Sequence, residues 1–138
     1  MPDVLKMCVP GKPEYVRTVR MTAASIASDA GFDIEAIEDI KLAVSEACNN
    51  TVVHASASHT TDYNVEFERA EAKLIITVTD AGPGYDTDSY EEPVIDELQI
   101  GGLGLFIIKA LMDEVDITSE PGVGTNIRMI KNLARDIV

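Results

Sequence analysis

The stretch EDIKLAVSEACNN, residues 38–50, predicts an amphipathic helix that also carries two polar side chains on a separate face. Its apolar stripe recurs at helical spacing and consists of Ile37, Ile40, Val44, Ala47 and Cys48. Glu46 and Asn50 lie one turn apart outside that stripe, so they share a face. A carboxylate can act as a general base, and an amide oxygen can bind a hard cation such as Mg2+. Taken alone, the pair is also what an ordinary solvated helix face contains.

The rest of the chain predicts an α+β domain. In chain order, the predicted elements are a strand at 4–9, a helix at 13–30 ended by Gly31, a helix from Asp33 to about His54, a strand hairpin at 63–69 and 73–79, a helix at about 103–113, and two strands at 115–120 and 125–130. Residues 56–62 and 81–102 are predicted to be loops, and a loop as long as the second is usually functional or disordered. Helices on one face of a mainly antiparallel sheet are the simplest packing of this order.

Composition and charge exclude several classes of protein. The 138 residues, 46% of them hydrophobic, predict a single domain over 1–138 with one core. Eleven Lys and Arg against 24 Asp and Glu give a formal net charge of −13, which argues against direct binding to nucleic acid or to an anionic membrane. No apolar run approaches the roughly 20 residues that span a bilayer, and the first residues do not resemble a signal peptide. We therefore expect a cytoplasmic protein in which Cys8 and Cys48 are buried free thiols.

The segment TDAGPGYD, residues 79–86, follows a buried strand pattern. Asp80 ends that strand, where its carboxylate can accept a hydrogen bond from an exocyclic amine of a nucleotide base. Gly82 and Gly84 allow a flat ligand to approach the backbone closely. The alternative is an ordinary Asp-Gly-Pro turn.

Two glycine-containing segments near the C-terminus are weak signals by themselves. In QIGGLGLF, residues 99–106, glycines precede an apolar helix, whose first N–H groups can bind an anion such as a phosphate. The segment PGVGT, residues 121–125, ends in Thr125, whose hydroxyl can bond to a base or to a carboxylate. Alone, the second segment is a β-turn.

In this order, the motifs resemble those of the GHKL ATPase family, which includes gyrase, Hsp90-type chaperones, histidine kinases and MutL. PEYVRTVR, EDIKLAVSEACNN, GGLGL and LMDEV more narrowly resemble bacterial anti-sigma factor serine kinases of the RsbW and SpoIIAB type. The resemblance runs nearly end to end. It implies the GHKL (Bergerat) fold, a two-layer α/β sandwich with a mixed, mostly antiparallel sheet and about three helices on one face.

The resemblance also implies a site for ATP and Mg2+. Asp80 would bind the adenine amine with help from Thr125, and Asn50 would hold Mg2+, while Glu46 would be the catalytic base. The remaining nucleotide-binding residues that it implies are Gly82, Gly84, Gly101, Gly102, Leu103, Gly104 and Leu105. A lid loop would span about 83–100.

The implied function is that of an anti-sigma factor with ATP-dependent serine-protein kinase activity. Its partners would be a sigma factor and a STAS-type anti-anti-sigma protein whose serine is phosphorylated, and it would form a homodimer. Arg20, on the predicted helix 13–30, matches a partner-binding arginine, although a solvated helix cation is the alternative.

Three other functions stay open at this point. A nucleotide-gated binding module without kinase activity is suggested by the absence of Lys and Arg between Lys73 and Lys109, since phosphoryl transfer usually gains from a nearby cation. The ATPase part of a histidine kinase is disfavoured because the two-helix dimerisation segment with its phosphoacceptor His is not found in these residues. A degenerate structural domain is hard to reconcile with the ordered set of motifs.

Overall fold

The computed structural model describes residues 3–58, 62–80, 103–120 and 124–133. Its elements, in chain order, are β1 (Asp3–Pro10), a 3-10 turn (Pro13–Tyr15), α1 (Val16–Ala30), α2 (Ile34–Ser58), β2 (Asp62–Ala70), β3 (Lys73–Asp80), α4 (Leu103–Leu111), β4 (Glu114–Glu120) and β5 (Gly124–Asn132). Over the described residues, the predicted order of helices and strands is confirmed. No helix in the described part of the chain is long and apolar enough to cross a membrane.

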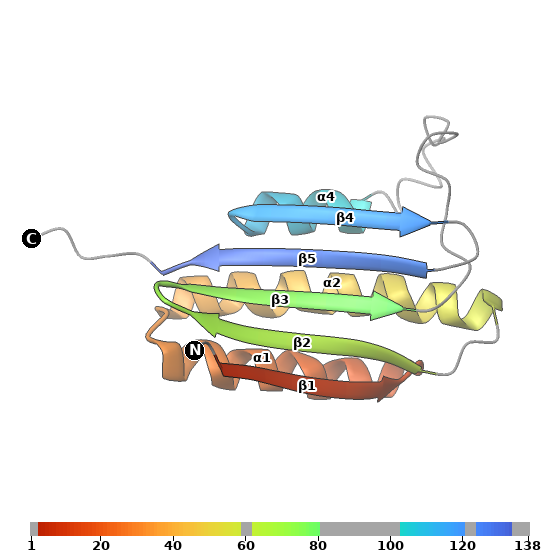
Figure 1. The fold of residues 1–138 in the computed structure, drawn as a ribbon, viewed down its shortest axis with the longest axis horizontal. Helices are drawn as coiled ribbons and strands as arrows, with labels where there is room; N and C mark the ends of the chain where they lie inside the picture. The colour runs from red at the N-terminus through yellow and green to blue at the C-terminus, as the bar shows by residue number, and fades with distance from the viewer. Residues whose placement is uncertain (1–2, 59–61, 81–102, 121–123, 134–138) are drawn as a thin grey trace, which may run out of the picture.

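The strands form one sheet in the order β1-β2-β3-β5-β4, and each neighbouring pair is antiparallel. The sequence predicted a mixed, mostly antiparallel sheet; the described strands pair only in the antiparallel sense. The reason lies in the connections. Two helices that run in opposite directions, α1 and α2, join β1 to β2, so the chain re-enters the sheet in the reverse direction (Figure 1).

The helices cover one face of the sheet, as predicted. Figure 1 shows α1, α2 and α4 side by side behind the strands, and α2 contacts both of its helical neighbours as well as β3 and β5. Strand β2 alternates between buried and exposed residues, with Tyr63, Val65 and Phe67 facing the helices. Its partner β3 contributes Leu74, Ile76 and Val78 to the same core. The single core therefore lies between the helical layer and this face of the sheet.

The helix ends follow the predicted capping residues, with one difference in length. Asp33 Oδ1 accepts a hydrogen bond from the backbone N–H of Ala36 at 2.8 Å, which caps the start of α2. Gly31 ends α1 in the left-handed region, with φ of +99°. The helix α2 runs to Ser58, so the loop predicted from Ser56 was wrong for its first residues. The segment HASAS contains no Gly or Pro to stop a helix, and Ala strongly favours one.

The two cysteines differ in exposure. Cys48 is fully buried in the core, as expected, whereas Cys8 is exposed, so the expectation of two buried thiols was wrong for Cys8. Cys8 lies on β1, at the edge of the sheet. On this strand Met7 and Val9 take the inward positions, and the intervening residue faces away from the helices.

The left-handed end of α1 predicts the effect of a substitution. We expect Gly31→Ala to lower the free energy of unfolding by about 1 kcal/mol, because a Cβ at positive φ is strained even though no described residue beyond the two chain neighbours comes within 4 Å of it. Gly31→Asn should lose less, since Asn tolerates this region better. Urea unfolding of the three proteins tests this, and equal stability of Gly31→Ala and the parent would contradict it.

Candidate functional site

A row of polar side chains crosses one end of the sheet. Asp80, the last residue of β3, is opposite Thr125 on β5, and Thr125 is opposite Ser119 on β4. Asp80 and Thr125 are only 3% and 2% exposed, and the hydroxyl oxygens of Thr125 and Ser119 are 3.0 Å apart. Side chains along a strand alternate between its two faces, and Asp80 alternates in step with the buried Leu74, Ile76 and Val78. Its side chain is therefore on the helix side of the sheet. The sheet pairing thus brings together two of the predicted adenine-binding residues.

A second group of polar atoms lies between α2 and α4. Glu46, halfway along α2, is half-buried, and its carboxylate packs against the start of α4. A Cβ added to Gly104 would lie only 3.0 Å from Glu46 Oε2. A larger residue at position 104 would therefore require the carboxylate to move. The structure brings together the predicted base and the predicted glycine-rich helix start, which belong to separate motifs in the sequence.

Asn50, one turn beyond Glu46, carries a buried polar atom that lacks a partner. Its Nδ2 has no hydrogen-bond partner among the described residues, although the residue as a whole is half-buried. Such an atom costs about 1–3 kcal/mol of desolvation when nothing satisfies it. The two ends of an amide are nearly isosteric, so a flip would present Oδ1 at the same place. Either a phosphate oxygen or a cation can therefore satisfy this side chain.

The residues near Asn50 limit what kind of metal site is possible. In the described ranges, no three His, Cys, Asp or Glu side chains gather in a way that could hold a metal ion. Mg2+ often uses only one or two protein ligands and takes the rest from water and substrate phosphates. The Asn50 amide can therefore serve as a protein ligand of a Mg2+ ion that is bound together with a nucleotide.

Two buried groups near this end of the sheet, Tyr63 and Cys48, are uncharged. Tyr63 is opposite Asp80 on β2, is buried, and lies close to the thiol of Cys48. Burial raises the pKa of Cys48 to about 12. Burial, followed by the neighbouring thiol, also raises the pKa of Tyr63. Both groups are uncharged at neutral pH. Tyr63 was not singled out from the sequence, where its alternation with polar residues marks it only as a strand residue.

Several predicted site residues cannot be placed. Gly82, Gly84, Gly101 and Gly102, together with the predicted lid at 83–100, lie outside the described residues. At the start of α4, Leu103 is exposed and Leu105 is half-buried in contact with the core.

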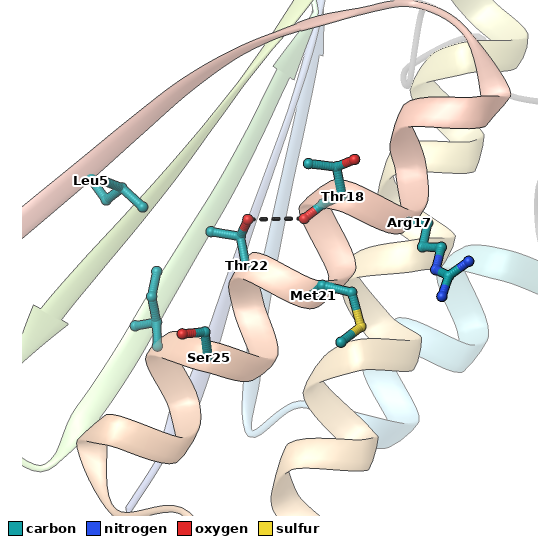
Figure 2. Close-up of a pocket in the computed structure, with 7 residues that line it drawn as sticks. Leu5, Arg17, Thr18, Met21, Thr22 and Ser25 are labelled. Atoms are coloured by element: carbon teal, nitrogen blue, oxygen red, sulfur yellow. Dashed lines mark hydrogen bonds between the residues drawn. The ribbon is translucent and has the colours of Figure 1, made fainter.

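Arg20 lies on α1 and is half-buried. The same helix forms one side of a groove of about 550 Å³ against the edge strand β1 (Figure 2). The groove is lined by Leu5, Arg17, Thr18, Met21, Thr22, Ser25 and Ile26. None of these is a predicted nucleotide-binding residue, so the groove is separate from the Glu46 and Asp80 groups. The sequence did not indicate it, because its walls belong to two separate elements, β1 and α1, and a linear pattern does not show the space between them.

The sequence matches the family model of the histidine kinase-like ATPase domain over residues 9–131. A serine-protein kinase RsbW from Halalkalibacterium halodurans is 41% identical over 99% of this chain and 88% of its own length. The chain belongs to the RsbW family of histidine kinase-like ATPase domains. The RsbW of Bacillus subtilis is 38% identical over 88% of this chain and 81% of its own length.

Solved structures support the fold of this family member. A crystal structure of the RsbU and RsbW domains of Rv1364c from Mycobacterium tuberculosis superposes with a TM-score of 0.73 and 24% identity, over 96% of this chain and 33% of that one. The histidine kinase domain of a blue-light activated kinase from Erythrobacter litoralis gives a TM-score of 0.59 at 22% identity, over 90% of this chain and 61% of that one. The predicted resemblance and the α+β fold are confirmed. Membership in an ATPase-domain family also supports the use of a nucleotide.

The Asn50 side chain predicts that one substitution has opposite effects on the stability of the protein and on its binding of nucleotide. We expect Asn50→Leu to raise the stability of the nucleotide-free protein by about 1 kcal/mol, because it removes a buried donor that has no partner among the described residues. The same variant should lose the thermal stabilisation produced by Mg-ATP. Melting curves with and without Mg-ATP measure both effects. Asn49→Leu, at an exposed neighbouring position, is the matched control and should keep the ATP response. A loss of stability in Asn50→Leu would contradict the prediction.

The two thiols should react differently in the native protein. At pH 8, a thiol reagent should label the exposed Cys8 and leave Cys48 unmodified until the protein unfolds, because Cys48 is buried and its pKa is about 12. Since this pKa is raised in the folded state, the stabilising effect of the neutral thiol is complete below the ordinary value of 9.0 and is lost progressively as the pH rises from there to about 12. Between pH 8 and 10 this loss amounts to about 1 kcal/mol. Urea unfolding at both pH values should show it in the parent and not in Cys48→Ala; rapid native labelling of two thiols would contradict the assignment.

Proposed function

We propose that this chain is an anti-sigma factor with ATP-dependent serine-protein kinase activity. In this proposal it binds Mg-ATP, sequesters a sigma factor and phosphorylates a serine of a STAS-type anti-anti-sigma protein. The observation that carries the proposal is the packing of the Glu46 carboxylate against Gly104, at the start of α4. In this proposal Glu46 is the general base, and the contact supports its place next to helix N–H groups that would suit a phosphate. The identity of about 40% to RsbW serine-protein kinases over nearly the whole chain supports it.

The two groups of polar residues correspond to the two ends of a nucleotide. Asp80 would accept a hydrogen bond from the adenine amine, and Thr125, directly opposite in the sheet, would assist it. The neutral Tyr63 and Cys48 nearby suit a flat, uncharged base. We propose that Gly82 and Gly84 line the adenine and that Gly101, Gly102, Leu103, Gly104 and Leu105 bind the triphosphate under a lid at about 83–100.

Asn50 would bind the Mg2+ ion that accompanies the nucleotide phosphates. Its amide, whose Nδ2 meets no partner in the described ranges, can ligate Mg2+ through Oδ1 or donate to a phosphate through Nδ2. When bound, Mg2+ would neutralise charge on the transferred phosphoryl group.

Glu46 would act as the base for the attacking serine. Its carboxylate accepts the hydroxyl proton as the serine oxygen bonds to the γ-phosphorus, the bond from that phosphorus to the β–γ bridging oxygen breaks, and ADP leaves with the bridging oxygen. The products are a phosphoserine and ADP. No Lys or Arg occurs between Lys73 and Lys109, so this chain adds few cations to the reaction, and we expect slow turnover.

The protein partners would dock on the first helix. Arg20, half-buried on α1, is the proposed partner-binding cation, and the groove between β1 and α1 lies on the same helix. We further propose that the chain works as a homodimer, that it forms one domain over 1–138, and that it is cytoplasmic, since ATP and sigma factors are found there.

The absence of Lys and Arg between Lys73 and Lys109 also favours a second function. A nucleotide-gated binding module would capture its partner in the presence of ATP without forming phosphoserine. Mass spectrometry of a STAS-type partner after incubation with Mg-ATP separates the two proposals. Phosphoserine supports the kinase, and ATP-dependent capture without it supports the module.

The role of Glu46 predicts a specific loss. We expect Glu46→Gln to lower the rate of phosphoryl transfer by about 10²- to 10⁴-fold, because an amide cannot accept the serine proton. ATP binding should persist, since Gln preserves the packing against Gly104. Transfer of radiolabelled phosphate measures the rate, and thermal stabilisation by ATP measures the binding. Glu38→Gln, at an exposed position of α2, is the control and should match the parent. An active Glu46→Gln variant would remove the proposed base.

A further inference from the structure

The end of α4 opposite to its glycine-rich start is tied to β5 by a lysine. Lys131 Nζ donates a hydrogen bond to the carbonyl oxygen of Leu111, the last residue of α4, at 2.6 Å. The same Nζ lies 3.4 Å from Asp39 Oδ2, in the second turn of α2. The side chains of Lys131 and Asp39 are only 13% and 33% exposed, whereas the ion pair Lys6–Glu66 is 73% and 47% exposed. Lys131 therefore joins three elements in a partly buried place where water screens it weakly.

Two further hydrogen bonds hold the same corner. The backbone N–H of Asp113 donates to the carbonyl oxygen of Ile130 at 2.9 Å. The carboxylate of Asp113 accepts a hydrogen bond from the backbone N–H of Asn132 at 2.6 Å. The last carbonyls of a helix lack partners within the helix and carry its negative dipole end, so a lysine there is favourable in both respects.

Geometry connects this corner to the proposed active site. Asp39 and Glu46 both belong to α2, while Leu111 and Gly104 are at opposite ends of α4. The nine residues of α4 span about 13 Å, so a tilt of about 5° at Leu111 would move the helix start by about 1 Å. A displacement of that size can cost about 10²-fold in rate when it misplaces reacting groups.

We propose that Lys131 and Asp39 are positioning residues that set the orientation of α4 relative to α2, and through it the contact between Glu46 and Gly104. Neither touches the nucleotide. The consequence for phosphate binding rests on the proposed function; the effect on α4 itself does not. Thr125 is six residues away along β5, about 20 Å, so the adenine end of the site should not respond.

Lys131→Met tests the proposal, because it keeps most of the aliphatic stem and removes the ammonium group. Lys109→Met is the matched control, since it removes an exposed lysine from the last turn of the same helix and changes the net charge equally. We expect the amides of residues 103–111 to exchange with deuterium about tenfold faster in Lys131→Met, with β2 and β3 unchanged. Lys131→Arg should restore slow exchange, and Lys109→Met should behave like the parent.

Nucleotide binding provides a readout that a general loss of stability would not reproduce. In Lys131→Met, we expect the affinity for ATP to fall about tenfold and the affinity for adenosine to stay unchanged, because only the phosphate end depends on α4. In kinase assays, kcat should fall more than KM rises. Asp39→Asn should show the same pattern, and the double variant should add little to it, since both changes remove one ion pair.

Unchanged exchange in α4, or an equal loss of ATP and adenosine binding, would overturn the proposal. Failure of the proposed function is distinguishable from this. If the parent binds no nucleotide, the proposed kinase is wrong, and the exchange rates of α4 alone then decide whether Lys131 and Asp39 position the helix.

Discussion

The burial of one stripe of α2 against the sheet is the interaction on which the rest of the structure depends. Ile40, Ala43, Val44, Ala47 and Cys48 are all fully buried there. Burying a Val or an Ile contributes about 1.5–3 kcal/mol each, so turning the helix by one residue, about 100°, would cost several kcal/mol. The polar face that carries Glu46 and Asn50 therefore has only one place to lie. That place is beside α4, because α2 is the middle helix of the layer.

Gly104 allows the start of α4 to pack closely against that face of α2. A Cβ at this position would lie 3.0 Å from Glu46 Oε2, so any other residue would require the carboxylate to shift. Asn50 carries a buried donor for which the described part of the chain supplies no partner, and a ligand can satisfy it. A site that is slightly unfavourable when empty and satisfied when filled is typical of functional positions.

Local patterns explain why so much of the fold could be predicted. Asp33 and Gly31 delimit helices through their own side-chain and backbone chemistry, and Tyr63, Val65 and Phe67 alternate with polar residues because one face of the sheet is buried. Where the prediction was wrong, local pattern carried little information. The helix α2 continues through the small residues after His54, where neither a breaker nor an apolar stripe marks its end. Cys8 is exposed because its side chain points to the face of the sheet that the helices do not cover, and the residues of one strand do not show which face that is.

Most helices and strands, the family resemblance and the residue types of the site could be predicted from the sequence, because each follows from short-range periodicity or from an ordered set of motifs. Which of these residues meet depends on the tertiary packing. Antiparallel pairing of β3 with β5 puts Thr125 opposite Asp80, and packing of α2 on α4 puts Gly104 against Glu46. The contact of Lys131 with Asp39 and Leu111 has no sequence signal, since its three residues come from a strand and two helices. Such contacts depend on how elements far apart in the chain share one core, and no local pattern contains that information.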